Sequence, residues 1–143
     1  MKGMTAEMKH KTTLIVRGGG DLASGVIHRL YKCGYQVLVL ECAKPSAIRR
    51  RVSFGEAVYD GTSRVEGVTG RLIKDISECR KVWDEKEIPI LVDENADAVS
   101  ELKPDALIDA ILAKKNLGTT RMMAPLTIGL GPGFTARVDV DYV

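Results

Sequence analysis

The residues of this chain with the clearest chemical potential form a glycine-rich turn, Gly18-Gly19-Gly20-Asp21-Leu22-Ala23. Gly18, Gly20 and Ala23 match the spacing G-x-G-x-x-G/A, in which each small residue has its own physical role. The first glycine allows a tight exit from a strand, and the second lets a pyrophosphate approach the backbone. Ala23 lets the following helix pack closely on a sheet. The turn therefore predicts a binding site for a nucleotide-type small molecule.

Glu41 and Cys42 follow a second apolar run, and Glu41 comes 21 residues after Gly20. An acidic side chain at this place in a nucleotide-binding unit accepts hydrogen bonds from an adenosine ribose. Because a carboxylate repels a 2′-phosphate, Glu41 favours NAD over NADP. The alternative for Glu41 is a solvated charge at the end of a strand. Cys42 is either a ligand contact or a small structural residue.

Asp21 stands where the turn enters its helix, and its charge opposes tight phosphate binding. The free N–H groups and the positive end of the helix dipole favour an anion at this position. A carboxylate satisfies these donors itself as an N-cap, and it repels a pyrophosphate at close range. We therefore expect Asp21 to cap the helix, so that the loop holds a phosphate weakly or contacts a ribose hydroxyl instead.

The elements that position these residues alternate between apolar strands and amphipathic helices. Strands are expected at 12–17, 37–40, 89–92, 106–109 and 126–130, and helices at 22–33, 76–87 and 93–102. In the first helix, the apolar positions from Leu22 to Tyr31 recur as one buried stripe, and Gly34 ends it. The alternation predicts an α/β fold, a Rossmann-like three-layer domain with a mostly parallel sheet. Ligands of such sheets bind beyond the carboxyl ends of the strands, so Arg17 and Asp109 are expected beside the glycine turn.

The segment between residues 43 and 74 has weaker patterns. Ser53 to Tyr59 favours a short helix capped by Ser53, with Glu56 at the capping-box position. Asp60-Gly61 predicts a turn, and residues 64–73 predict one or two strands. Asp75 or Ser77 is expected to cap the helix that follows.

No group of residues predicts a catalyst. His10 lies in the N-terminal segment and His28 on the outer face of the first helix, and no catalytic triad, paired carboxylates or metal-ligand cluster can be identified. A basic, hydroxyl-rich connection either supplies anion contacts or is a solvated loop; it contains Lys114, Lys115, Thr119, Thr120 and Arg121. The sequence thus offers a ligand site without an evident catalyst.

Length and composition limit the classes of function. The 143 residues suit one domain, 12–143, after a flexible leader, 1–11. A net charge of +2 is too small to indicate nucleic-acid binding, and no apolar run is long enough to span a membrane. Three cysteines without C-x-x-C spacing predict no disulfide framework and no bound metal, so we expect a cytoplasmic protein. Cys33 and Cys79 fall on apolar faces of predicted helices and are expected in the core.

Four blocks of the sequence, taken together, resemble the accessory proteins of selenium-dependent molybdenum hydroxylases, the YqeB-type family. In chain order they are Ile15–Gly25 (IVRGGGDLASG), Arg50–Gly61 (RRVSFGEAVYDG), Ala106–Thr120 (ALIDAILAKKNLGTT) and Ala124–Ala136 (APLTIGLGPGFTA), before Val138-Asp-Val-Asp141. The resemblance implies a role in maturing a molybdenum hydroxylase, alongside XdhC-type chaperones. It also implies the hydroxylase or its maturation machinery as a partner and a molybdopterin dinucleotide as a candidate ligand besides NAD.

The resemblance carries two further expectations. Members of the family continue beyond the Val-Asp-Val-Asp segment, so the chain is expected to be a short member or the N-terminal part of a longer protein. If the second block is a family signature, its polar residues Ser53, Glu56 and Asp60 face the same edge as the glycine turn. The family supplies no reaction or catalytic residue.

Three functions are therefore weighed. The first is an accessory protein that binds a nucleotide or molybdopterin-type ligand and serves the maturation of a molybdenum hydroxylase, which explains most of the sequence. The second is an NAD-dependent oxidoreductase, which needs an acid or base that the sequence does not reveal. The third is a regulatory nucleotide-sensing domain. Parallel-sheet domains of this size often form homodimers, and this state stays open for the chain.

Overall fold

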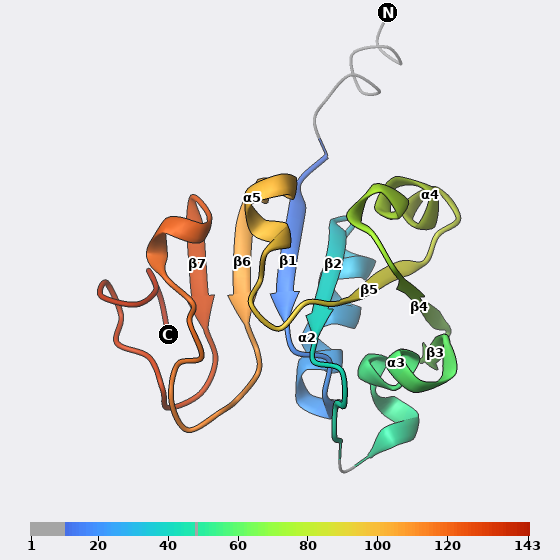
Figure 1. Cartoon of the computed structure of the whole chain (residues 1–143), viewed down its shortest axis with the longest axis horizontal. Coiled ribbons are helices and arrows are strands. Elements are labelled where there is room, and N and C mark those ends of the chain that lie inside the picture. Colours follow the sequence, from blue (N-terminus) through green and yellow to red (C-terminus); the bar gives the residue numbers. More distant parts are fainter. Residues whose placement is uncertain (1–10, 48) are drawn as a thin grey trace, which may run out of the picture.

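A seven-stranded sheet forms the centre of the molecule (Figure 1), in a computed structural model that describes residues 11–47 and 49–143. The strands lie in the order β3-β4-β5-β2-β1-β6-β7. Their bounds are β1 Thr13–Arg17, β2 Gln36–Glu41, β3 Thr62–Val65, β4 Val68–Ile73, β5 Ile88–Val92, β6 Ala106–Asp109 and β7 Leu126–Gly129. Neighbouring strands are parallel except β3 and β4, which form an antiparallel hairpin. The predicted leader, apart from Lys11, and His10 lie outside the described residues.

Helices cover both faces of this sheet. They are α2 Asp21–Lys32, α3 Ala57–Asp60, α4 Cys79–Asp84 and α5 Ala98–Leu102, with short 3-10 helices at Arg50–Val52, Phe54–Glu56, Ile76–Glu78 and Arg121–Met123. Side chains of α2 and α3 join the core on one face, and those of α4 and α5 join it on the other. The expected α/β class and mostly parallel sheet are confirmed. No helix in the described part of the chain is long and apolar enough to cross a membrane.

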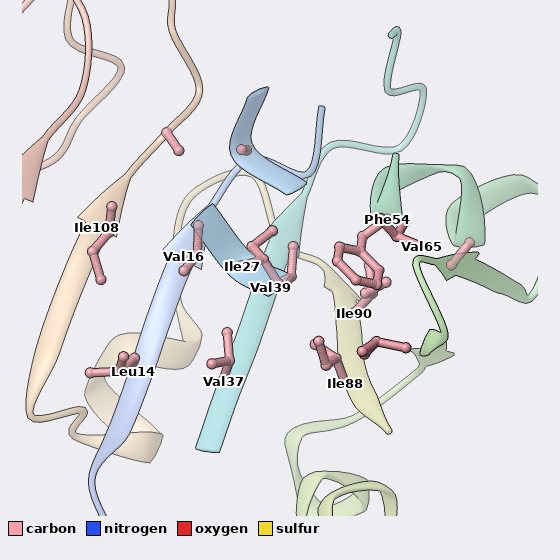
Figure 2. Packing of buried hydrophobic residues seen from close by; sticks show 14 of the residues in the cluster. Leu14, Val16, Ile27, Val37, Val39, Phe54, Val65, Ile88, Ile90 and Ile108 are labelled. Carbon is pink, nitrogen blue, oxygen red and sulfur yellow. The ribbon is translucent and has the colours of Figure 1, made fainter. Parts of the chain in front are cut away.

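The core alternates along each central strand because successive side chains of a strand point to opposite faces. Leu14 and Val16 join one hydrophobic cluster, whereas Ile15 between them joins the other. Ile27 of α2 belongs to the first cluster (Figure 2), and Cys79 of α4 belongs to the second. A strand that is buried on both faces has a continuous apolar sequence, which is why β1 and β2 could be recognised before the fold was known.

The chain reverses its direction across the sheet at β1. After β1 the chain passes through α2 to β2, and strands β3 to β5 lie beyond β2 on the same side of β1. The last two strands, β6 and β7, lie on the other side of β1. In open α/β sheets such a reversal leaves a crevice beyond the carboxyl ends of the strands. The residues that follow β1, β2 and β6 meet at this edge, which is the lower edge of the sheet in Figure 1.

Helix α2 matches the predicted first helix, but two of its expected core residues are wrong. Gly34 has a φ of +99°, and the N–H of Tyr35 donates to the carbonyl of Leu30, as in a Schellman C-cap. Leu22, however, is 67% exposed, and Cys33 is exposed as well. Leu22 lies in the first turn, at the carboxyl edge of the sheet, and Cys33 follows the last helical residue. Neither side chain therefore lies over the strands.

The segment between residues 43 and 74 departs from the predicted capped helix. Ser53 precedes two short helical turns, Phe54–Glu56 and α3, but its side chain caps neither of them. The predicted capping box is therefore wrong, because the Ser53 hydroxyl binds the glycine turn instead. Gly61, with a φ of +85°, confirms the predicted turn, and β3 and β4 are the predicted strands.

Both later helices are shorter than expected, although Asp75 caps the first helical segment as predicted, and α4 ends at Asp84. The carboxylate of Asp75 accepts the N–H of Ser77, and Glu78 accepts the N–H of Asp75, which completes a capping box. Hydrogen bonds from the side chain and then the backbone of Ser77 lower the pKa of Asp75. Asp93 accepts two N–H groups at the start of α5, so the helix predicted from residue 93 begins at Ala98.

Candidate functional site

Gly18 turns the chain out of β1 in a conformation that requires glycine. Its φ is +101°, and a Cβ atom at this position would lie 2.9 Å from the carbonyl oxygen of Ala110. The N–H of Gly18 donates to the carbonyl of Leu40 at the end of β2, over 2.8 Å. The tight exit predicted for the first glycine thus has a steric cause, the close approach of the chain that follows β6.

The Gly19 peptide is held from several directions. Its N–H donates to Oε2 of Glu41 over 2.7 Å, which places the acidic residue from the end of β2 against the turn. Its carbonyl accepts the N–H of Gly55 over 2.8 Å and the hydroxyl of Ser53 over 2.6 Å. The Ser24 hydroxyl reaches the same carbonyl over 3.2 Å. Residue 19 is therefore fixed by polar contacts from β2, α2 and the segment after residue 52.

The segment Ser53–Gly55 is the part of this arrangement that motif spacing did not reveal. A Cβ at Gly55 would lie 2.9 Å from the Gly19 carbonyl oxygen, so glycine is needed there for close backbone contact. The resemblance pointed to Ser53, Glu56 and Asp60, and Ser53 does contact the turn. Glu56 and Asp60 line a separate hollow of about 440 Å³ beside β3.

Gly20 differs from its two neighbours because the protein leaves space around it. It is the N-cap residue of α2, with φ −69° and ψ −175°, and no atom lies within 4 Å of a Cβ built there. The expectation that Asp21 caps this helix is wrong, because Asp21 is already the first helical residue. Its carboxylate instead approaches Arg49, at 3.8 Å. The first N–H groups of a helix have no partner within the helix, and those of α2 begin at this open position.

Glu41 uses both carboxylate oxygens within the protein. Oε2 accepts the Gly19 N–H, and Oε1 accepts the N–H of Cys42 over 2.8 Å. The thiol of Cys42 beside it is half-buried. Burial raises the pKa of this thiol, a hydrogen bond from the Lys44 backbone opposes the change, and the negative charge of Glu41 raises the pKa further. Cys42 is therefore a protonated, weakly nucleophilic thiol at neutral pH.

Two adjoining hollows open at this edge of the sheet. One of about 310 Å³ is lined by residues 18–23, 41, 42, 44–46 and 110–112. The other, of about 280 Å³, lies between the ends of β1 and β2, the start of the α5 connection and residue 117. Gly18, Glu41, Cys42 and Ile111 line both. Eight of the ten residues predicted at this edge thus line the first hollow, Arg17 lines the second, and Asp109 lines neither.

Asp109 is buried, with 1% of its surface exposed, and it belongs to a polar network below the cavity. Its Oδ2 accepts the hydroxyl of Thr119 over 2.6 Å, and the same hydroxyl oxygen accepts a hydrogen bond from Nη1 of Arg17 over 2.8 Å. Arg17 also donates to the carbonyls of Glu94 and Leu117. This network fixes the connection after β6 against β1.

The basic connection that follows β6 does not act as one group. Thr119 is buried in the network just described, while Lys114 and Lys115 are exposed. Arg121 donates to the carboxylate of Asp141 over 3.0 Å, on the far side of β7. Among the residues that the structure describes, no three His, Cys, Asp or Glu side chains are grouped as metal ligands.

Comparison with known proteins places this chain beside one longer relative. Over 130 residues it is 52% identical to a protein of Escherichia coli K12 described as "Uncharacterized protein YqeB". The match takes in 91% of this chain and 24% of that protein, so the chain spans about a quarter of the relative's length. No model of a protein family and no solved structure matches the chain. The match supports the YqeB-type resemblance by name, and that name assigns no activity.

Proposed function

We propose that this chain is a Rossmann-like domain that binds a nucleotide-type ligand at the Gly18–Gly20 turn and serves the maturation of a molybdenum hydroxylase in the cytoplasm. NAD and a molybdopterin dinucleotide are the candidate ligands. The hydroxylase or its maturation machinery is the candidate partner.

The observation that carries the binding proposal is the empty space at Gly20. Gly18 and Gly19 are explained by the fold, since a Cβ would meet backbone atoms within 3.0 Å at each. At Gly20 no atom of the protein lies within 4 Å of an added Cβ, so packing does not explain the glycine there. The space beside it is open to a ligand. A pyrophosphate that approaches here meets the unpaired N–H groups and the positive dipole end of α2.

The surroundings suit a ligand of nucleotide size. The two adjoining hollows, of about 310 and 280 Å³, together fall in the range of small-molecule sites. Asp21 opposes an anion at the helix start, but its neighbour Arg49 offsets part of this charge. Lys44, which lines the first hollow, adds a positive charge at its entrance.

The maturation role rests on sequence. Three of the four blocks that resemble YqeB-type proteins meet at one place in the fold, since the Gly18–Gly20 turn contacts Ser53–Gly55 and the chain after β6. An NAD-dependent oxidoreductase has less support. The ionisable groups around the first hollow are Asp21, Glu41, Cys42 and Lys44, and Glu41 already accepts two backbone N–H groups.

A thermal-shift panel tests the binding proposal. It compares NAD, NADP, ATP, CTP and molybdopterin cytosine dinucleotide, each with the intact chain. A ligand at about 100 times its Kd stabilises the folded state by about 2.7 kcal/mol, which raises Tm by several degrees. Stabilisation by the molybdopterin ligand supports the maturation role, whereas stabilisation by NAD alone favours the oxidoreductase. No shift with any of the five compounds would contradict a nucleotide site.

A further inference from the structure

Exposed apolar side chains gather at the β7 edge of the molecule. We define the edge patch as Met122, Leu126, Val138 and Tyr142, whose exposed fractions run from 37% to 92%. Within the described residues, seven of the eleven exposed large apolar side chains lie beyond residue 111. Single exposed apolar residues need no explanation, but a contiguous group indicates an interaction surface.

Polar contacts hold the edge patch in a fixed shape. Arg121 donates to the Asp141 carboxylate over 3.0 Å and to the carbonyl of Arg137 over 2.8 Å. Asp141 in turn accepts the N–H of Thr127 over 2.9 Å. Each residue of the patch is the chain neighbour of one of these four, so the network joins the three segments that carry the patch: β7, the Arg121–Met123 turn and the segment after residue 136. The apolar surface is therefore built into the fold.

A hollow extends the edge patch toward α5. It has a volume of about 860 Å³ and is bordered by α5 residues such as Val99 and by residues 121–125, which include Met122 of the edge patch. Met123, Ala124 and Pro125 line it with apolar side chains, and Lys103 and Arg121 line it with charged ones. Protein–protein interfaces likewise combine apolar contact area with polar and charged side chains.

We infer that the edge patch docks the polypeptide that forms the remaining three quarters of a YqeB-type protein. In the E. coli relative the matched segment is 24% of the protein, so about three times as much polypeptide is joined covalently to an equivalent unit. Covalent linkage raises the effective concentration of the remaining polypeptide at the surface of this unit. An apolar surface on the unit is then buried against that polypeptide even where the affinity between the two parts is weak. This inference does not depend on the ligand proposed for the glycine turn.

A second copy of this chain fits the edge patch less well. Symmetric pairing through β7 would need free backbone groups on its outer edge. That edge already binds the segment after residue 140, because the Gly129 N–H donates to the Tyr142 carbonyl and the Asp141 N–H donates to the Thr127 carbonyl. Ile128 and Tyr142 also form a parallel bridge.

Hydroxyl-radical footprinting of a full-length chimera tests the inference. In the chimera this chain replaces the matched residues of E. coli YqeB, and the modification rates of its side chains are compared with those in the chain alone. Met122 and Tyr142 are expected to react at least fivefold more slowly in the chimera. Tyr35 and Tyr59, exposed away from β7, serve as internal controls whose rates stay unchanged. The double variant M122E/V138E should restore fast modification of Tyr142.

Three results would overturn the inference. The first is equal modification of Met122 and Tyr142 in the chimera and the chain alone. The second is an equal change at all four side chains, which would show that the difference is not specific to the patch. The third is a concentration-dependent dimer of the chain alone, seen by light scattering and abolished by M122E/V138E, which would assign the patch to a second copy.

Discussion

A methyl group added at Gly18 would meet other atoms of the protein, whereas one added at Gly34 would not. Gly18 combines a φ of +101° with close contact to Ala110, whereas Gly34 has a similar φ of +99° and open space. The φ cost is about 1–2 kcal/mol at either site, and contact at Gly18 adds about 1–3 kcal/mol. We expect G18A to lower the free energy of unfolding about twice as much as G34A. Urea denaturation measures both, and equal losses would contradict the steric account of Gly18.

The three cysteines should react with iodoacetamide in a set order at pH 8. Cys33 is exposed and should react first, while burial raises the pKa of Cys79 to about 12 and keeps it unreactive until the chain unfolds. Cys42 is intermediate, because burial and then the charge of Glu41 raise its pKa. E41Q removes that charge, lowers the Cys42 pKa and should accelerate its alkylation. Mass spectrometry of the labelled peptides measures the order, and alkylation of Cys79 before Cys33 would contradict it.

Residue types predicted which residues border the hollow at the sheet edge but not how their side chains are paired. The spacing of Gly18, Gly20 and Ala23 is a local property, so it could be read directly from the sequence. The partners of Glu41 are set by the approach of β2 to the turn, which no local pattern encodes. Asp21 was expected to cap α2, yet the extended backbone at Gly20 starts the helix one residue earlier.

At the scale of elements, the Arg17–Thr119–Asp109 network joins β1, β6 and the connection after β6. T119V removes a hydroxyl that both accepts from Arg17 and donates to Asp109, and so leaves two buried charged groups short of a partner. The expected loss in unfolding free energy is about 2–4 kcal/mol, since hydrogen bonds to charged groups contribute about 1.5–3 kcal/mol. T119S keeps the hydroxyl and is the matched control. Similar urea midpoints for T119V and T119S would show that the hydroxyl does not hold the network.

Elements that their own local sequence determines could be predicted, whereas elements that depend on contacts with distant residues could not. Buried parallel strands such as β1 and β2 have continuous apolar sequences and could be located to within one or two residues. The segment from residue 43 to Gly61 could not, because Ser53 and Gly55 are determined by contacts with Gly19 in a distant part of the sequence. The capping-box pattern at Ser53 was locally sound, but a tertiary hydrogen bond replaced it.

At the scale of the whole molecule, acid should loosen the β7 edge. Hydrogen bonding from the Thr127 backbone and then from Arg121 lowers the pKa of Asp141 in the folded protein. Because the pKa of Asp141 is lower in the folded than in the unfolded protein, its carboxylate stabilises the fold at pH values above the unfolded pKa of about 3.9. This stabilisation is lost as the pH falls through the folded pKa. D141N should lower the urea midpoint at pH 7 and reduce its decline between pH 5 and pH 2. An unchanged decline in D141N would mean that Asp141 does not contribute to acid sensitivity.

The strand order is the global feature that the sequence could not supply. Alternating strands and helices predicted a parallel sheet, but not the outer position of the β3–β4 hairpin or the reversal at β1. The reversal brings the Gly18–Gly20 turn beside the chain after β6, and so creates the cavity. Asp109 was expected at that cavity because it ends β6; its burial with Thr119 depends on a connection whose path has no local pattern.

The central claim, that Gly20 is kept small for a ligand, is tested most directly by comparing two glycine variants. Neither Gly20 nor Gly25 has an atom within 4 Å of an added Cβ, so G20A and G25A both preserve the fold. Isothermal titration with NAD and with molybdopterin cytosine dinucleotide gives the affinities of both variants and of the unchanged chain. For whichever compound binds, the account predicts at least a tenfold loss in G20A, equivalent to about 1.4 kcal/mol, and no loss in G25A. Equal affinity in the unchanged chain and G20A would contradict binding at the turn.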